Sequence, residues 1–248
     1  MINFSALRPE GLAGKLVRYP FRMLPRGLAV PILQGPLRGK TWIVGSHLHG
    51  CWLGSYEWKT QRLLAAQVKP GGVFYDVGAN VGFYSLLAAK LIDPGQIYAF
   101  EPLPSNLVYL RKHLELNRVR NVEVMEMGIC DSVGEAFFQT EETRAMGRIG
   151  ADGDLSIRTS SLDALLEEER ISPPNYIKMD IEGSEFRALL GARQCFDQFR
   201  PKLFLATHGS EVHDNCCQLL SSWNYEFCYT ARESADRAEM FAWHRSIE

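Results

Sequence analysis

Apolar and polar positions alternate along this chain with two periods, one typical of strands and one typical of helices. Short runs rich in β-branched and aromatic residues predict strands, and apolar residues repeating every three to four positions predict helices. The predicted strands cover 72–77, 96–100, 121–127, 176–179 and 202–206. Helices with one apolar face are predicted at 83–91, 105–114, 186–190 and 212–223. Because strands and helices alternate, the pattern predicts an α/β fold with a parallel sheet and helices on both faces.

The last part of the chain departs from this alternation. Two strand-like runs, 225–229 and 240–243, are separated by only ten residues. A parallel crossover needs a dozen or more residues and usually a helix, so these runs predict an antiparallel hairpin. We therefore expect a mostly parallel sheet that is closed at its edge by an antiparallel strand.

Smaller signals refine the predicted elements. Ser105 is a predicted N-cap of the second helix, because its hydroxyl can accept a hydrogen bond from a free backbone N–H. Ser160 and Asp163 resemble a capping box before a further helix. An extra strand is predicted at 135–139, followed by a polar, glycine-rich loop at 141–153.

The composition is that of an ordinary globular protein. The 248 residues are 46% hydrophobic and 23% charged, which excludes a disordered, collagen-like or coiled-coil main state. The apolar runs fall far short of the ~18 residues of a membrane span. A net charge of −2 argues against a protein built to grip nucleic acid. Six cysteines form no CxxC pair and no signal peptide is evident, so we expect reduced thiols and a cytoplasmic location.

The N-terminal segment differs from the rest in charge. Up to Tyr56 the chain has seven basic residues and one acidic residue, a net charge of +6, which leaves −8 for the remainder. We interpret 1–57 as a basic leader or cap and 58–248 as the main domain. The simplest interpretation packs the apolar side of the leader on that domain. The alternative is that the basic, apolar stretch 15–24 makes peripheral contact with a membrane or an anionic substrate.

The strongest chemical signal is a glycine loop with the sequence DVGANVG, which covers 76–82 between a predicted strand and a predicted helix. Glycine lets the backbone turn sharply and approach a ligand, and the start of a helix offers free N–H groups. The loop departs from the dinucleotide fingerprint GxGxxG, because Asn80 and Phe83 replace two of its glycines. Asp76, which opens the loop, suits an ammonium group better than a pyrophosphate.

A second signal is Glu101, which lies 23 residues after Gly78 at the end of the next predicted strand. A carboxylate in that position can accept hydrogen bonds from both hydroxyls of a ribose. Taken alone, each signal is equally compatible with turn glycines and a surface glutamate. Together, at this spacing and on these elements, they predict a nucleoside-binding site.

Three sequence blocks carry a resemblance to a known family. VFYDVGANVGFYS, IYAFEPLPSN and YIKMDIEGSEFRALLGA resemble the FkbM-type methyltransferases, which are Rossmann-like and depend on S-adenosylmethionine. The resemblance covers about 35–229, with GPLRGKTW and GSYEWKT similar to the family's leader. It implies a class I methyltransferase domain over 58–248, with a seven-stranded sheet whose last strand is antiparallel. It also implies O-methylation of a hydroxyl on a saccharide, glycolipid or secondary metabolite.

The same resemblance implies which residues hold S-adenosylmethionine. Asp76, Gly78 and Asn80 of the glycine loop contact the methionine moiety. Glu101 binds the ribose, and Pro102 with 127–129 flanks the adenine. Asp180 faces the amino group or the transferred methyl, and two leader residues fold over the cofactor. The full expected set is Tyr56, Glu57, Asp76, Gly78, Ala79, Asn80, Gly82, Glu101, Pro102, Gly128, Ile129 and Asp180.

An acceptor hydroxyl benefits from a general base or a metal ion. The expected catalytic residues lie after successive strands at the carboxyl edge of the sheet: Asp180, Glu182 and His208, with Glu185 beside them. We expect His208 to be the base or else a metal ligand, and Asp180 to orient donor and acceptor. The alternatives are that the glutamates stabilise the start of a helix and that His208 is an ordinary polar loop residue.

The sequence leaves a divalent metal ion unassigned. His47, His49 and Cys51 alternate and would share one face of a strand, but no second cluster of ligands supports a metal there. We expect these leader residues to line the pocket instead.

Two rival functions remain open. A nucleic-acid methyltransferase commonly carries an Asn/Asp-Pro-Pro-aromatic motif after the fourth strand, where this chain has Asp180, Ile181, Glu182 and Gly183. A catalytically silent binding subunit has no need of Asp76 or Glu101. We therefore expect a small-molecule or glycan acceptor and no nucleic-acid partner. The sequence leaves the oligomeric state open, a homo-oligomer included.

Overall fold

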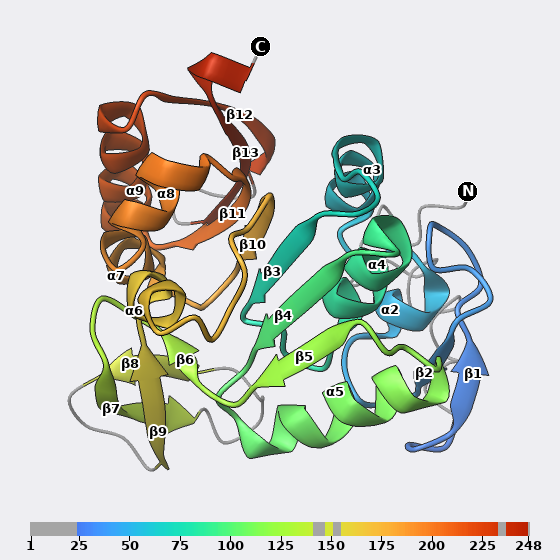
Figure 1. Ribbon diagram of the computed structural model, residues 1–248. Coiled ribbons are helices and arrows are strands. Elements are labelled where there is room, and N and C mark those ends of the chain that lie inside the picture. Colours follow the sequence, from blue (N-terminus) through green and yellow to red (C-terminus); the bar gives the residue numbers. More distant parts are fainter. Residues whose placement is uncertain (1–23, 141–146, 151–154, 233–236, 248) are drawn as a thin grey trace.

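The computed structural model describes residues 24–140, 147–150, 155–232 and 237–247. Its centre is a seven-stranded sheet in the order β12-β13-β11-β10-β3-β4-β5 (Figure 1). The strands are β3 (Val73–Val77), β4 (Gln96–Phe100), β5 (Val122–Met125), β10 (Tyr176–Met179), β11 (Lys202–His208), β12 (Tyr225–Arg232) and β13 (Arg237–His244). The first five pair in parallel, which confirms the predicted mostly parallel α/β sheet.

The last two strands form the predicted antiparallel hairpin. The expectation that the antiparallel strand closes the edge is wrong, because β13 lies between β11 and β12 and pairs antiparallel with both. β12 therefore runs in the same direction as β11, one strand away, and forms the edge itself. In this place β13 finds backbone partners along both of its sides, which satisfies its N–H and C=O groups.

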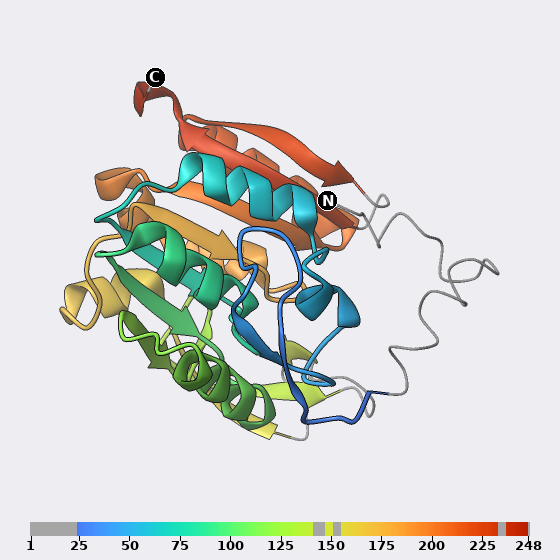
Figure 2. The ribbon, with the colours of Figure 1, turned by 90° about the vertical axis from the view of Figure 1, so that its right-hand side faces the viewer.

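Helices cover both faces of the sheet (Figures 1 and 2). One face carries α3 (Trp58–Gln67), α4 (Phe83–Ile92) and α5 (Pro104–Leu116), and the other carries α6 (Leu162–Glu167), α7 (Glu185–Leu190), α8 (Arg193–Phe199) and α9 (Ser210–Ser222). Along β3 the side chains alternate between two apolar clusters, with Phe74 in one and Tyr75 and Val77 in the other. This period of two is why a short, mostly apolar run becomes a strand buried on both faces.

A second, smaller sheet follows β5. It contains β6 (Gly128–Ile129), β9 (Leu155–Ser160), β7 (Gly134–Thr140) and β8 (Gly147–Gly150), in that order. The strand predicted at 135–139 is β7. Within the predicted loop 141–153 the structure describes only 147–150, which form β8. The basic stretch 15–24 lies outside the described residues except for Leu24.

Both predicted helix caps are displaced. The N-cap of α5 is Leu103, so Ser105 lies inside the first turn. Pro104 occupies the first helical position, where the missing N–H of proline costs nothing. The N-cap of α6 is Ser161 instead of Ser160, and its Oγ accepts a hydrogen bond from the N–H of Ala164 at 3.1 Å.

The described part of the leader is built into the same core as the rest. It forms β1 (Ala29–Pro31), β2 (Thr41–Ile43) and α2 (His49–Leu53). Trp42 and Cys51 are fully buried in the apolar cluster that also contains Phe83 and Leu86 of α4. The described part of the leader and the main domain therefore share one hydrophobic core.

One buried histidine connects the leader to the glycine loop. His113 of α5 is fully buried, and its Nε2 accepts a hydrogen bond from the N–H of Ile43 at 3.1 Å. Its Nδ1 donates to the carbonyl oxygen of Val81 at 2.7 Å, and its ring stacks on Trp42 with centroids 3.9 Å apart. These contacts require the neutral ring, and burial lowers the pKa of His113 to about 4.

All six cysteines are free thiols. In the described ranges, no helix combines the length and the apolar character that crossing a bilayer requires. The predicted cytoplasmic location stays a prediction.

His113 should make the protein less stable in mild acid. Because its pKa is lower in the folded chain than the usual 6.5, the unfolded chain binds more protons between pH 6.5 and pH 4. The free energy of unfolding should therefore fall by about 2 kcal/mol from this group between pH 7 and pH 5. Urea unfolding at pH 7, 6 and 5 measures the loss. In His113→Gln, which cannot ionise, the pH dependence should be smaller by that amount, and equal slopes in the two proteins would contradict the assignment.

Candidate active site

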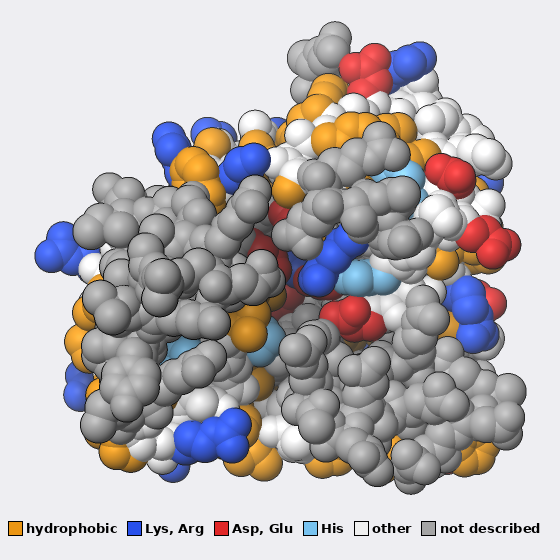
Figure 3. Space-filling model, turned by 180° about the vertical axis from the view of Figure 1, so that it is seen from behind, with side chains coloured by type: hydrophobic (Ala, Val, Ile, Leu, Met, Phe, Trp, Pro, Cys, Tyr) orange, Lys and Arg blue, Asp and Glu red, His pale blue; other side chains and the backbone are white. Residues whose placement is uncertain are grey.

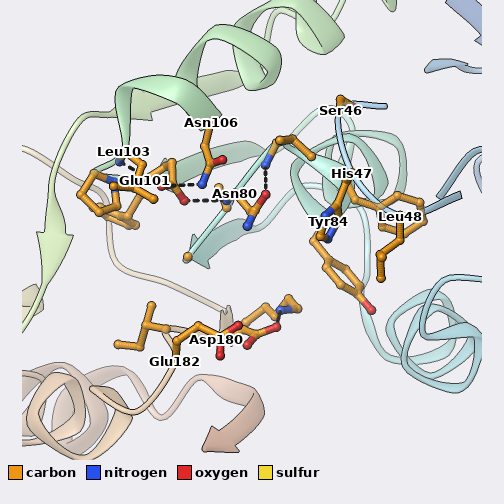
Figure 4. A pocket seen from close by; sticks show the side chains of 18 of the residues that line it. Ser46, His47, Leu48, Asn80, Tyr84, Glu101, Leu103, Asn106, Asp180 and Glu182 are labelled. Carbon is orange, nitrogen blue, oxygen red and sulfur yellow. Dashed lines mark hydrogen bonds and ion pairs between the residues drawn. The ribbon is translucent and has the colours of Figure 1, made fainter. Parts of the chain in front are cut away.

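The carboxyl ends of β3, β4 and β10 open into a cavity of about 640 Å³, with the leader on its other side (Figure 4). This volume suits a small molecule or cofactor. Acidic, basic and histidine side chains gather around a hollow on the face shown in Figure 3. The cavity is lined by ten of the twelve expected cofactor residues: Tyr56, Glu57, Gly78, Ala79, Asn80, Glu101, Pro102, Gly128, Ile129 and Asp180.

The glycine loop lies against the end of β10 because Gly78 has no side chain. Gly78 has a φ of +84°, and a Cβ there would lie 2.0 Å from the carbonyl oxygen of Asp180. The N–H groups of Gly78 and Ala79 both donate to the carbonyl oxygen of Phe100. The loop is thus held between two neighbouring strand ends, and glycine is required at the point of closest approach.

Glu101 lies at the cavity wall with its carboxylate fixed by three donors. It is only 3% exposed. Its Oε2 accepts from the N–H of Asn80 at 2.7 Å, and its Oε1 accepts from the N–H of Leu103 at 3.0 Å and from Nδ2 of Asn106 at 3.1 Å (Figure 4). Burial raises the pKa of Glu101 to about 7, against the opposing effect of these hydrogen bonds. The carboxylate is held in one orientation towards the cavity.

Lys178 of β10 lies beneath this site, and sequence reasoning missed it. Its Nζ lies 3.0 Å from Oδ2 of Asp180 and 4.4 Å from the ring centroid of Tyr84. Burial disfavours its charge, but the carboxylates of Asp180, Glu57 and Asp76 outweigh burial and raise the pKa of Lys178. The available signal was a lysine within a four-residue strand that is otherwise wholly apolar.

Asp76 and Gly82 are the two expected cofactor residues that do not line the cavity. Asp76 is fully buried and accepts a hydrogen bond from Oγ of Ser85 at 2.6 Å. Its Oδ1 has no hydrogen-bond partner within the described ranges, and burial raises its pKa. Gly82 has a φ of +91° and packs against Leu110.

The expected catalytic residues form one cluster beside the cavity. Asp180 and Glu182 line the cavity, and His208 lies behind them. Nε2 of His208 is 3.7 Å from Oδ1 of Asp180 and 3.5 Å from Oε2 of Glu182, while Nδ1 is 2.9 Å from Oε1 of Glu185. The same Glu185 oxygen accepts from the N–H groups of Ile181 and Gly183. Glu185 thus fits the alternative interpretation, in which a glutamate stabilises the start of the helix that follows, here α7.

The leader supplies the opposite wall. Tyr56, Glu57, His47 and His49 line the cavity, and Oε2 of Glu57 accepts a hydrogen bond from the hydroxyl of Tyr84 at 2.6 Å. Cys51 is buried in the core instead. The prediction that the two histidines and Cys51 share one strand face is wrong, because α2 begins at His49 and turns the following side chains in helical steps.

A family model and several named proteins are similar to this chain. The family model described as methyltransferase FkbM domain matches residues 76–227. The hexuronic acid methyltransferase AglP of Haloferax volcanii is 29% identical over 132 residues, which cover 52% of this chain and 54% of AglP. The 31-O-demethyl-FK506 methyltransferase FkbM of Streptomyces tacrolimicus is 30% identical over 183 residues, or 60% of this chain and 68% of that protein.

A solved structure shows the same fold. The crystal structure of methyltransferase FkbM from Methylobacillus flagellatus aligns with a TM-score of 0.53 at 20% identity, over 74% of this chain and 47% of that one. This chain therefore spans about half the length of AglP and of the solved structure.

The close approach at Gly78 should make this position intolerant of any side chain. Gly78→Ala places a methyl group in the space of the Asp180 carbonyl oxygen, and overpacking of this kind costs about 1–3 kcal/mol. Gly71→Ala is the matched control, because Gly71 has a φ of +87° with no atom within 4 Å of a Cβ. The control measures backbone strain alone, about 1–2 kcal/mol. Urea unfolding should show a larger loss for Gly78→Ala; equal losses would exclude the steric argument.

Proposed function

The chain belongs to the methyltransferase FkbM family, and from that premise we propose that it is an S-adenosylmethionine-dependent O-methyltransferase. Its acceptor is a hydroxyl of a saccharide, glycolipid or secondary metabolite. The observation that carries the proposal is the fixed carboxylate of Glu101 facing the same cavity as the glycine loop and Asp180. The names of the relatives support the acceptor class, since one acts on a hexuronic acid and another on the 31-O position of a demethylated FK506.

The cavity residues fit the cofactor. The oxygens of Glu101 remain at the cavity wall, where a carboxylate can accept from ribose hydroxyls while its three donors keep it in place. Gly128, Ile129 and Pro102 supply short or apolar surface for the adenine. Asp180, whose pKa is lowered by Lys178 despite burial, supplies negative charge near the glycine loop, which suits the ammonium and sulfonium groups. Glu57 adds a second carboxyl group to the cavity lining. When bound, S-adenosylmethionine supplies a methyl group on a positively charged sulfur.

The acceptor is proposed to bind between this site and the leader. Tyr56, His47 and His49 form that wall, so residues 1–57 act as the cap of the methyltransferase domain at 58–248. The acceptor hydroxyl then reaches Asp180 and Glu182, with His208 behind them. These three residues activate the hydroxyl, and the surrounding walls align it and exclude water.

Loss of the Glu101 carboxylate should weaken cofactor binding. Glu101→Ala is expected to cost about 1.5–3 kcal/mol of S-adenosylmethionine binding, the scale of hydrogen bonds to a charged group, which is roughly a 10- to 150-fold rise in Kd. Isothermal titration calorimetry measures this directly. Glu123→Ala is the matched control, because Glu123 is exposed on β5 and does not line the cavity.

An unchanged Kd in Glu101→Ala would remove the cofactor assignment. Absence of S-adenosylmethionine binding by the unaltered chain would favour the catalytically silent alternative. Transfer of labelled methyl to RNA or DNA, and not to glycan or small-molecule extracts, would favour the nucleic-acid alternative.

A further inference from the structure

The cluster behind the cavity contains a histidine nitrogen in an unusual position. Nε2 of His208 is out of contact with solvent and has no hydrogen-bond partner among the described residues. It lies between Oδ1 of Asp180 at 3.7 Å and Oε2 of Glu182 at 3.5 Å. We propose that Asp180, Glu182 and His208 bind one divalent first-row metal cation, such as Mn²⁺, at the edge of the cavity.

The orientation of the ring supports a ligand role. Glu185 is fully buried, and its Oε1 lies 2.9 Å from Nδ1 of His208. Oε1 of Glu185 already accepts from the N–H groups of Ile181 and Gly183, and an ionised carboxylate can only accept. The hydrogen of this third contact is therefore on Nδ1 of His208. In the neutral ring the lone pair of Nε2 then points towards two carboxylates, neither of which can donate. A carboxylate that orients a histidine in this way is the usual outer partner of a metal-bound imidazole.

The spacing of the three ligand atoms fits a shared cation. All three lie within 4.8 Å of one another. In the tetrahedral geometry of zinc sites, bonds of about 2.0–2.2 Å separate two ligand atoms by roughly 3.3–3.6 Å. The two distances from Nε2 are close to this range, whereas they are long for direct hydrogen bonds.

The local charge also favours a bound cation. Asp180, Glu182 and Glu185 place three carboxylates around one imidazole. Lys178 contacts Asp180 through its other oxygen, Oδ2, so Oδ1 remains directed towards His208. Arg237 also lines the cavity, and its charge acts on Asp180 and Glu182. Two positive side chains thus face three carboxylates, and a divalent cation would offset the excess negative charge.

The donor set indicates the class of cation. One imidazole nitrogen and two carboxylate oxygens suit Mn²⁺, Fe²⁺ or Zn²⁺ better than Ca²⁺, which takes six to eight oxygens. Three protein ligands leave coordination positions open towards the cavity, because Asp180 and Glu182 line it. Those positions can take an acceptor hydroxyl.

Only the catalytic role of this site rests on the proposed function. A cation here polarises the acceptor hydroxyl and favours loss of its proton to water at the cavity mouth. The oxygen lone pair forms the new O–C bond with the methyl group. The electron pair of the breaking C–S bond passes to sulfur, which becomes a neutral thioether.

Binding of Mn²⁺ alone to the full chain tests the site. Free Mn²⁺ is counted by electron paramagnetic resonance during titration with MnCl₂, and one bound ion per chain is expected. His208→Ala and Glu182→Gln should each weaken binding at least tenfold. Glu185→Gln should weaken it about 10- to 100-fold, as expected for loss of an outer partner. The matched controls are His244→Ala, whose ring contacts Ser246, and Glu211→Gln, which is exposed on α9; both should bind Mn²⁺ normally.

Glu182→Gln keeps the test decisive if His208→Ala fails to fold, since Glu182 is partly exposed. No stoichiometric Mn²⁺ binding by the unaltered chain, or binding unaffected by Glu182→Gln, would overturn the proposal and leave an imidazolium between two carboxylates. S-adenosylmethionine binding is measured on the same samples. Normal cofactor binding without Mn²⁺ binding would reject the metal site alone, and the reverse result would reject the proposed function alone.

Discussion

The site depends on one steric constraint, the contact between Gly78 and the backbone of Asp180. The carbonyl oxygen of Asp180 occupies the space that a Cβ at Gly78 would need. The N–H of Asp180 in turn donates to the carbonyl oxygen of Val77 at 3.0 Å. The loop that follows β3 therefore approaches the backbone after β10 more closely than any side chain at position 78 would allow. This contact brings the glycine loop and the acidic end of β10 to the same cavity, so one wall can serve both a cofactor and an acceptor.

Buried charge is the second determinant, and Lys178 is at its centre. Isolated carboxylates in a protein interior carry a large desolvation cost unless a cation compensates them. Lys178 is only 4% exposed and lies 3.0 Å from Asp180. It also faces Asp76 across the paired strands. Lys178 opposes the effect of burial on the carboxyl groups of Asp76 and Glu57, whose pKa values burial raises. The pKa of Asp180 is lowered by Lys178 and His208 despite burial.

The leader is joined to this site through the core and not by surface contact alone. His113 links Ile43 of β2 to Val81 of the glycine loop with two hydrogen bonds, and Trp42 stacks on its ring. On the cavity side, Glu57 accepts from Tyr84. Movement of the leader would break both sets of contacts, so the leader wall of the cavity and the glycine loop are held together.

The sequence by itself determined the features that depend on neighbouring residues: the core strands, the glycine loop, the hairpin, and Glu101 at the end of β4. These follow from local periodicity and from the rule that parallel strands end at one edge. Only the tertiary structure decided that β13 lies between β11 and β12 in the sheet. It also decided that leader strands enter the core and that Lys178 forms an ion pair with Asp180. The contacts of His113 with Ile43 and of His208 with Glu185 span 70 and 23 positions. Such pairings depend on how whole elements pack, and no local pattern encodes them.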